Sequence, residues 1–220
     1  MNAARREFVL SQTLVAAPAL CPEIRLRLVT AACPLWTASV EDLERLSLPD
    51  PFWAFAWPGG QALARHLLDH PGLVRGRRVL DVGAGSALQA IAALMAGASS
   101  ALAADIDLFA AEAAQVNAEL NGVALEVASD DRVGGAAAGD YDVVLAGDMF
   151  YEPQLAARLS GWLAALARAG ATVLVGDPGR GLLPAAGLSL LAEYETPPDA
   201  DGPGAPTSLT GVFALEASAL

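Results

Sequence analysis

The stretch Arg78–Gln89 limits the fold of this chain more than any other part of the sequence. It begins with a short apolar run rich in β-branched residues, which is typical of a buried strand. Gly83 and Gly85 then break the run, and Ala, Leu and Ile with helical spacing follow directly. The stretch therefore predicts a strand, a glycine turn and a helix. Because glycine has no Cβ, the backbone N–H groups of such a turn can approach a ligand closely.

Two residues of this stretch distinguish between the nucleotide-type cofactors that use such turns. A dinucleotide site has the spacing Gly-x-Gly-x-x-Gly, in which the third glycine allows close packing beside a pyrophosphate. Leu88 stands at that third position, and Asp81 places a carboxylate next to the turn. We expect Asp81 to repel a pyrophosphate and to hold the cationic aminoacyl end of S-adenosylmethionine through bound water or backbone. The sequence thus favours the sulfonium cofactor over a nicotinamide dinucleotide.

Asp105 follows a second apolar run, residues 101–104. In a doubly wound sheet, an acid at the end of the second strand faces the ribose hydroxyls of a bound nucleoside. Both cofactor classes use this acid, so Asp105 does not choose between them. The alternative is that Asp81 and Asp105 only cap strand ends and bind nothing.

Composition limits the class of protein and of partner. The chain has 220 residues, of which 54% are hydrophobic and 17% are charged, as expected for one globular domain with a substantial core. Its net charge of −12 argues against a nucleic-acid partner and favours a positively charged substrate segment. Cys21 and Cys33 are too few and too isolated for a metal site or a disulfide framework. We therefore expect no metal, a reducing compartment and a cytoplasmic location.

Two segments imitate membrane-directed sequences. Residues 5–21 resemble an export signal, but Glu7 interrupts the charged end and Pro18 breaks the apolar part, so we interpret them as mature sequence. Residues 82–104 carry no charge, yet their glycine and alanine content fits a buried strand-helix-strand unit better than a bilayer span. No membrane partner is expected.

An aromatic loop, Pro51–Gln61, precedes the glycine turn. We expect Phe52 and Phe55 to plug the core beneath the sheet, whereas Trp57 is either a core residue or a wall of the cofactor pocket. Residues 1–50 are predicted to form an N-terminal cap segment, and residues 51–220 the cofactor-binding domain. The helix after the aromatic loop is predicted over residues 62–68.

The second informative stretch runs from Tyr141 to Glu152, where an apolar strand ends in Gly147-Asp148 and Tyr151 follows. Ligands of open sheets bind beyond the carboxyl ends of the strands, which places Asp148 and Tyr151 beside the reactive methyl of the cofactor. The alternative is that Asp148 only caps the helix predicted over 154–169.

The other predicted elements complete the sheet. After the helix at 109–120, a third strand over 125–128 leads to Asp130 and Asp131, one of which could accept from an adenine amino group. A strand at 171–176, a short helix from about Pro184 and two terminal strands follow. The terminal strands are predicted near 191–195 and 208–215, separated by a loop at 197–206. Strands alternating with helices, then a closing hairpin, predict an α/β fold with a mostly parallel seven-stranded sheet.

Four stretches of the chain carry a family resemblance: Pro51–Asp69, the glycine turn, Ala104–Asp107 and Gly147–Tyr151. They resemble the lysine methyltransferases of the electron transfer flavoprotein beta subunit and their bacterial relatives, within the seven-β-strand protein methyltransferases. The resemblance implies a Rossmann-like sheet that closes with an antiparallel hairpin and has helices on both faces.

The resemblance also implies a set of site residues. The positions implied to line the S-adenosylmethionine site are Trp57, Gly83, Ala84, Gly85, Asp105, Asp131 and Gly147. Asp148 and Tyr151, as an Asp-x-x-Tyr motif, are implied to hold the target lysine. Ala87 stands where the family has a further glycine, and we expect its methyl group to narrow the methionine end of the pocket.

The function expected from the resemblance is methyl transfer to lysine side chains of the electron transfer flavoprotein beta subunit, with ribosomal proteins as further substrates. Three alternatives stay open at this point: a small-molecule amine N-methyltransferase, a nicotinamide-dependent oxidoreductase and a non-catalytic cofactor-binding module. The sequence does not decide the oligomeric state.

Overall fold

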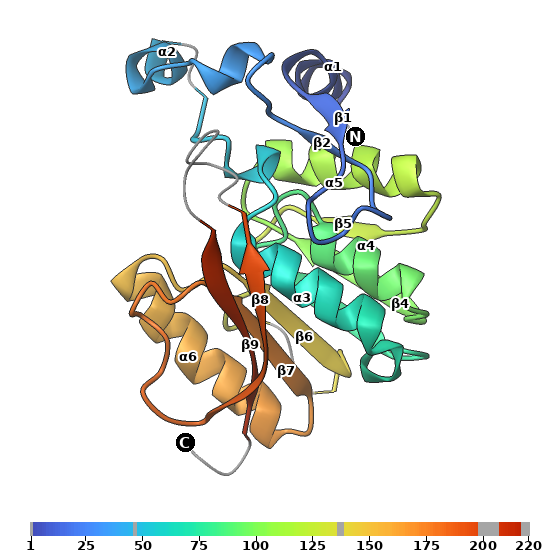
Figure 1. The fold of residues 1–220 in the computed structure, drawn as a ribbon, viewed down its shortest axis with the longest axis vertical. Helices are drawn as coiled ribbons and strands as arrows, with labels where there is room; N and C mark the ends of the chain where they lie inside the picture. The colour runs from blue at the N-terminus through green and yellow to red at the C-terminus, as the bar shows by residue number, and fades with distance from the viewer. Residues whose placement is uncertain (1, 46–47, 136–138, 198–206, 217–220) are drawn as a thin grey trace.

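A computed structural model describes residues 2–45, 48–135, 139–197 and 207–216. Its centre is a seven-stranded sheet in the order β5-β4-β3-β6-β7-β9-β8 (Figure 1). The strands are β3 (Arg78–Val82), β4 (Ser100–Ala104), β5 (Glu126–Ala128), β6 (Val143–Gly147), β7 (Thr172–Asp177), β8 (Leu188–Thr196) and β9 (Ser208–Leu215). Strands β5, β4, β3, β6 and β7 are parallel, and β9 runs antiparallel to both β7 and β8. The predicted sheet with its closing hairpin is confirmed.

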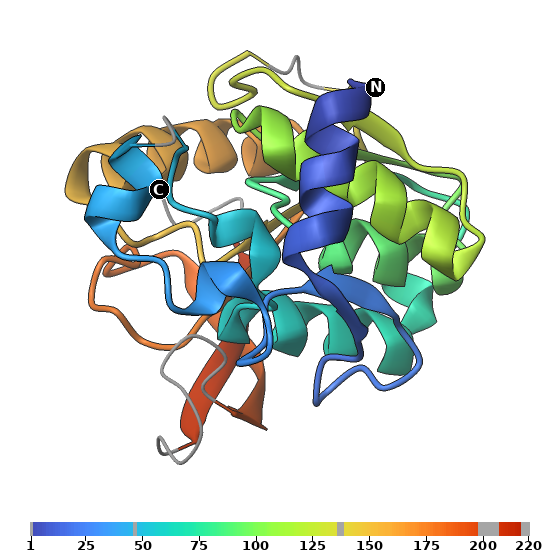
Figure 2. The ribbon, with the colours of Figure 1, turned by 90° about the horizontal axis from the view of Figure 1, so that it is seen from above.

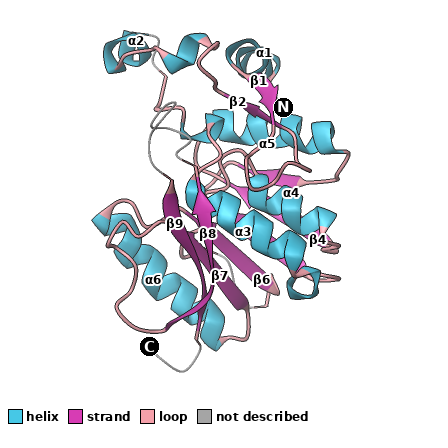
Figure 3. Cartoon of the chain, viewed as in Figure 1, coloured by secondary structure: helices cyan, strands magenta, loops and turns pink. Residues whose placement is uncertain are grey.

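Helices cover both faces of the sheet, as Figure 3 shows. They are α3 (Pro58–Asp69), α4 (Leu88–Met95), α5 (Leu108–Asn121) and α6 (Pro153–Arg168). Because side chains alternate along a strand, Val79 packs with α3 and α4 in one core cluster, and Leu80 packs with α6 in another. Among the residues described, no helix is long and apolar enough to cross a membrane.

The N-terminal segment packs on α5. It consists of α1 (Ala3–Gln12), β1 (Leu14–Ala16), β2 (Leu26–Leu28), the short 3-10 helix η1 (Pro34–Trp36) and α2 (Val40–Arg45). Helix α1 crosses over α5 (Figure 2), and Val9 joins Trp53 and Ala113 in a third core cluster. The aromatic loop forms the 3-10 helix η2 (Phe52–Ala54), and a further one, η3 (Pro71–Leu73), follows α3. A domain boundary at residue 50 stays a prediction.

Two sequence predictions about the elements are wrong. No helix begins near Pro184, since residues 178–187 form a loop in which Gly179, Gly181 and Gly187 have φ values of +89°, +80° and +84°. Helix α3 begins at Pro58 rather than at residue 62, because proline suits the first helical position and the two glycines that follow are helical here. Most of the predicted loop at 197–206 lies outside the described residues.

Candidate active site

The carboxyl ends of β3, β4 and β6 open onto one cavity of about 640 Å³. This volume lies in the range of small-molecule and cofactor sites, and the position is where open α/β sheets bind ligands. Of the residues that the family resemblance implies for the site, all except Ala84 line the cavity: Trp57, Gly83, Gly85, Asp105, Asp131, Gly147, Asp148 and Tyr151. The side chain of Ala84 packs instead in the core cluster of α3 and α4.

Two of these glycines have side chains packed closely against them. A Cβ on Gly83 would lie 1.9 Å from Sδ of Met149, and the residue has a φ of +64°. A Cβ on Gly147 would lie 2.7 Å from Oε1 of Gln89. Both glycines line the cavity, and the positive φ of Gly83 is a conformation that suits glycine.

Asp105 ties the glycine turn to the end of β4. Its Oδ2 accepts from the Gly85 N–H at 2.9 Å, and its Oδ1 accepts from the Asp107 N–H at 2.9 Å. Each carboxylate oxygen keeps a second lone pair, which can accept from a hydroxyl group in the cavity. Ile106, the next residue, is 74% exposed and gives the cavity an apolar wall that our sequence analysis missed.

Asp81 lies away from the cavity surface. It is fully buried and does not line the cavity, and its Oδ2 accepts from the Ala90 N–H in α4 at 3.0 Å. Burial raises the pKa of Asp81 to about 8. The carboxyl group thus does not reach the cavity directly, and the prediction that it holds the aminoacyl end of the cofactor through bound water or backbone stays a prediction.

Ala87 does not narrow the cavity either. It has a φ of +61° directly before α4, and its side chain is fully buried in the core cluster of α3 and α4. The methyl group faces the core because the left-handed backbone turns it away from the cavity. The expected crowding at the methionine end is therefore wrong.

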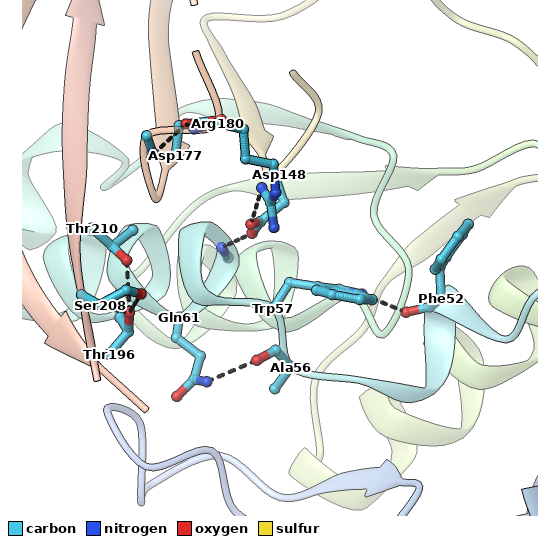
Figure 4. Close-up of polar contacts among 12 residues, drawn as sticks. Phe52, Ala56, Trp57, Gln61, Asp148, Asp177, Arg180, Thr196, Ser208 and Thr210 are labelled. Carbon is cyan, nitrogen blue, oxygen red and sulfur yellow. Dashed lines mark hydrogen bonds and ion pairs between the residues drawn. The ribbon is translucent and has the colours of Figure 1, made fainter. Parts of the chain in front are cut away.

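The aromatic loop supplies another wall of the cavity. The Trp57 Nε1–H donates to the Phe52 carbonyl oxygen at 2.8 Å, which fixes the indole against the loop (Figure 4). The ring of Phe52 lies 5.9 Å from that of Trp57 and 6.3 Å from that of Tyr151. Phe52 is 54% exposed, whereas Trp53 is only 2% exposed. The prediction that Phe52 plugs the core is wrong, and Trp53 has that role.

Asp148 is held from two sides. Its Oδ2 accepts from the Gly60 N–H at the start of α3 at 2.8 Å, and its Oδ1 accepts from Arg180 Nη1 at 2.7 Å (Figure 4). Burial raises the pKa of Asp148, and the Arg180 charge opposes this shift. Asp148 does not cap α6, because Glu152 accepts from the first N–H groups of that helix. Arg180 was not among the predicted site residues, and its position after a strand end is the only feature of the sequence that indicates a role in the site.

Two further predicted residues lie at the rim of the cavity. Tyr151 is 54% exposed, and partial burial raises the pKa of its hydroxyl. Asp131 accepts from Arg158 Nη2 at 2.7 Å, which lowers the pKa of Asp131. Among the described residues, no group of three His, Cys, Asp or Glu side chains could hold a metal ion.

Comparisons with known proteins agree with this geometry. The family model "Ribosomal protein L11 methyltransferase (PrmA)" matches residues 62–149. The electron transfer flavoprotein beta subunit lysine methyltransferase of Xenopus laevis is 47% identical over 177 residues, which cover 80% of this chain and 70% of that protein. The homolog of that enzyme in Caenorhabditis elegans is 36% identical over 211 residues, covering 89% of this chain and 84% of that protein.

The chain belongs to the electron transfer flavoprotein beta subunit lysine methyltransferase family. It is an S-adenosylmethionine-dependent protein-lysine methyltransferase, and the nicotinamide-dependent alternative is wrong. The solved structure of Trm5b from Pyrococcus abyssi shares the fold, with a TM-score of 0.52 and 12% identity over 93% of this chain and 56% of that one.

The residues of the cavity fit the cofactor of this methyltransferase family. The glycine turn allows close approach, Asp105 has lone pairs for the ribose hydroxyls, and Ile106 and Trp57 offer apolar surface to flat or aliphatic groups. Asp148 and Tyr151 line the same cavity from the end of β6. A cofactor on the turn and an amine beside Asp148 therefore share one space.

Proposed function

We propose that this enzyme methylates lysine side chains of the electron transfer flavoprotein beta subunit. The observation that carries the proposal is the position of Asp148, a buried carboxylate in the same cavity as the glycine turn. Relatives that are 47% identical are named for that substrate. The net charge of −12 supports a substrate segment that is rich in positive charge.

The cavity residues define what each part of the site does. Bound S-adenosylmethionine supplies an electrophilic methyl group on its sulfonium. Asp105 would hold the ribose hydroxyls, Gly83 and Gly85 would let the cofactor approach the backbone, and Ile106 would contact the base. Asp148 and Tyr151, which line the cavity after the end of β6, would receive the target amine.

Asp148 and Tyr151 act on the amine by positioning it. A lysine amine has an ordinary pKa near 10.4, so it must lose a proton before its lone pair can attack. Asp148 has used one lone pair of each oxygen on Gly60 and Arg180, and the remaining ones can accept from the amine N–H. Tyr151 fixes the direction of approach. Holding the lone pair in line supplies most of the rate in such a site.

The test is transfer of radiolabelled methyl from S-adenosylmethionine to the purified recombinant beta subunit, read on a gel and followed by mass spectrometry. We expect a labelled beta-subunit band with the methyl group on lysine. All 13 basic residues of the enzyme are arginine, so it cannot label lysines of its own. An enzyme that binds the cofactor but leaves the beta subunit unlabelled would contradict the proposal, and label in small molecules would favour the amine N-methyltransferase.

Ribosomal proteins form a second arm of the same test, because the matching family model is that of the ribosomal protein L11 methyltransferase. The match covers residues 62–149, which contain the glycine turn and Asp148 but not the loop with Arg180. The match therefore concerns the cofactor half of the site. We expect weaker labelling of ribosomal proteins than of the beta subunit.

We also propose that the protein works in a bacterial cytoplasm, as our sequence interpretation expects. Cys21 and Cys33 are both free and buried, which suits a reducing compartment. Cell fractionation with an antibody against the enzyme checks this location, and detection only outside the cytoplasm would contradict it.

A further inference from the structure

The carboxylate that faces the target lysine is already paired with a cation of the chain itself. Arg180 Nη1 lies 2.7 Å from Asp148 Oδ1, and both residues line the cavity. The side chain of Asp148 is 9% exposed, and that of Arg180 is 30% exposed. The pair is therefore largely shielded from water, where charges interact more strongly than at the surface.

The turn that carries Arg180 is itself anchored. Asp177, the last residue of β7, accepts from the Gly179 and Arg180 N–H groups at 2.7 Å and 3.1 Å (Figure 4). Asp148 is anchored as well, through the Gly60 N–H of α3. The backbone of Arg180 and the carboxylate of Asp148 are thus each held by a further hydrogen bond, so the pairing is a built feature of the site.

An unpaired carboxylate at this place would hinder the reaction. A buried negative charge stabilises the ammonium form of an approaching lysine and raises its pKa, whereas methyl transfer needs the neutral amine. A guanidinium beside the same carboxylate has the opposite effect, because it repels a second cation. Arginine suits this task because it stays charged at all working pH values.

We propose that Arg180 is a positioning residue that keeps Asp148 paired, so that the site takes the target lysine as a neutral amine. The inference rests on the proposed lysine substrate. The amine loses its proton to water at the cavity mouth, and Arg180 keeps its own protons. Asp148 then orients the neutral amine with its remaining lone pairs.

The groups around Asp148 make Arg180 decisive for the local charge. Asp177 at the end of β7 is 2% exposed, and its Oδ2 has no hydrogen-bond partner among the described residues. The start of α3 adds the partial positive charge of a helix N-terminus, and Tyr151 is a neutral hydroxyl. Arg158 and Arg132 also line the cavity, but they pair with Asp131 and Asp130, so removing Arg180 takes away the only cation paired with Asp148 among the described residues.

The experiment compares pH profiles of beta-subunit methylation by the wild type, Arg180→Gln and Arg180→Lys. For Arg180→Gln we expect the rising limb of kcat to move up by about one pH unit, with about tenfold lower kcat near neutral pH and no rise in KM for the beta subunit. Arg180→Lys keeps a cation, so the rising limb of its kcat–pH profile should lie where that of the wild type lies. Calorimetric titration with S-adenosylmethionine verifies that each variant is folded.

Arg158→Gln is the matched control, since Arg158 pairs with Asp131 in the same cavity, away from Asp148. The rising limb of the kcat–pH profile of Arg158→Gln should not move. If Arg180→Gln does not fold, Arg180→His should lose activity as its ring is deprotonated above about pH 6.5, where the wild type gains activity. If the wild type is active and the rising limb of Arg180→Gln does not move, the inference is overturned while the proposed function stands. A wild type that leaves the beta subunit unlabelled overturns the proposed function, and the inference with it.

Discussion

At the scale of single residues, the environment of each acid decides its role. Asp81, Asp105 and Asp148 all follow apolar strands, and the sequence alone suggests similar roles for them. Asp81 is fully buried beneath the turn, Asp105 holds the turn through two N–H groups, and Asp148 is paired with Arg180. Only the last two present oxygen atoms to the cavity.

Asp148→Asn is expected to lower methyl transfer by about 100-fold or more, because the amide no longer presents two acceptor oxygens to the amine and misplacement by a small distance is costly. Asparagine tolerates the φ of +58° that Asp148 adopts, so the fold should persist. Kinetics with the beta subunit and calorimetry with S-adenosylmethionine measure the two effects separately. Nearly unchanged cofactor affinity is expected, and a fully active variant would refute the role of Asp148.

Asp81→Asn tests the buried carboxyl beneath the turn. Burial raises the pKa of Asp81 from an ordinary 3.8 to about 8, so between these values the folded state holds a proton that the unfolded state has lost. The free energy of unfolding of the wild type should therefore fall as pH rises through this window, by at most about 1.4 kcal/mol per pH unit from this group.

Asparagine cannot titrate, and its oxygen can still accept from the Ala90 N–H. Denaturant unfolding at several pH values should give a flatter curve for the variant than for the wild type between about pH 4 and pH 8. Parallel curves would show that Asp81 does not hold the extra proton.

At the scale of elements, close backbone packing explains what local pattern did not reveal. Sequence analysis took Gly59 and Gly60 as part of a loop, yet both lie in the first turn of α3. A Cβ on Gly59 would lie 2.3 Å from the Gly176 oxygen of β7, and one on Gly176 would lie 2.1 Å from the Gly59 oxygen. The helix therefore touches the strand backbone, and this contact brings the Gly60 N–H to Asp148.

Ala87→Gly tests how the glycine turn joins α4. Glycine relieves the left-handed conformation, which costs an alanine about 1 kcal/mol or more, but it also removes a buried methyl group that contributes about 0.8 kcal/mol. We expect stability to change by less than about 1 kcal/mol and the affinity for S-adenosylmethionine to stay the same.

Gly85→Ala is the contrasting variant, since Gly85 has a φ of +50° and lines the cavity. Its added methyl group should weaken cofactor binding in the same titration. Tighter binding by Ala87→Gly would mean that the Ala87 methyl does reach the cofactor.

At the scale of the whole molecule, the fold and the net charge work together. The parallel strands bring the turn, Asp105 and Asp148 to one edge of the sheet, although they are far apart in the chain. The N-terminal segment packs on α5, and Trp53 beside it lines the cavity too. The charge of −12 then surrounds this site with a negative potential.

Ionic strength tests that potential. Between about 50 mM and about 300 mM salt we expect KM for the beta subunit to rise several-fold while kcat stays nearly constant, because salt screens attraction between exposed charges but leaves buried pairs intact. Steady-state kinetics at fixed pH measure both constants. A KM that is independent of salt would show that the net charge does not attract the substrate.

The sequence by itself determined the seven-stranded α/β sheet, the glycine turn and eight of the residues that line the cavity. Such features follow from local patterns, since apolar periodicity and glycine breaks reflect interactions between neighbours in the chain. The extended last strands and the loop at 178–187 were less clear, because short apolar runs with glycine suit several structures.

Only the tertiary structure decided which side of the turn each residue faces. Asp81 and Ala87 point into the core, Ile106 points into the cavity, and Arg180 meets Asp148 across two strand ends. These outcomes depend on backbone direction and on contacts between residues that are distant in the chain. A pattern of neighbouring residues carries no information on such contacts, and so the ion pair at the centre of the site became visible only in three dimensions.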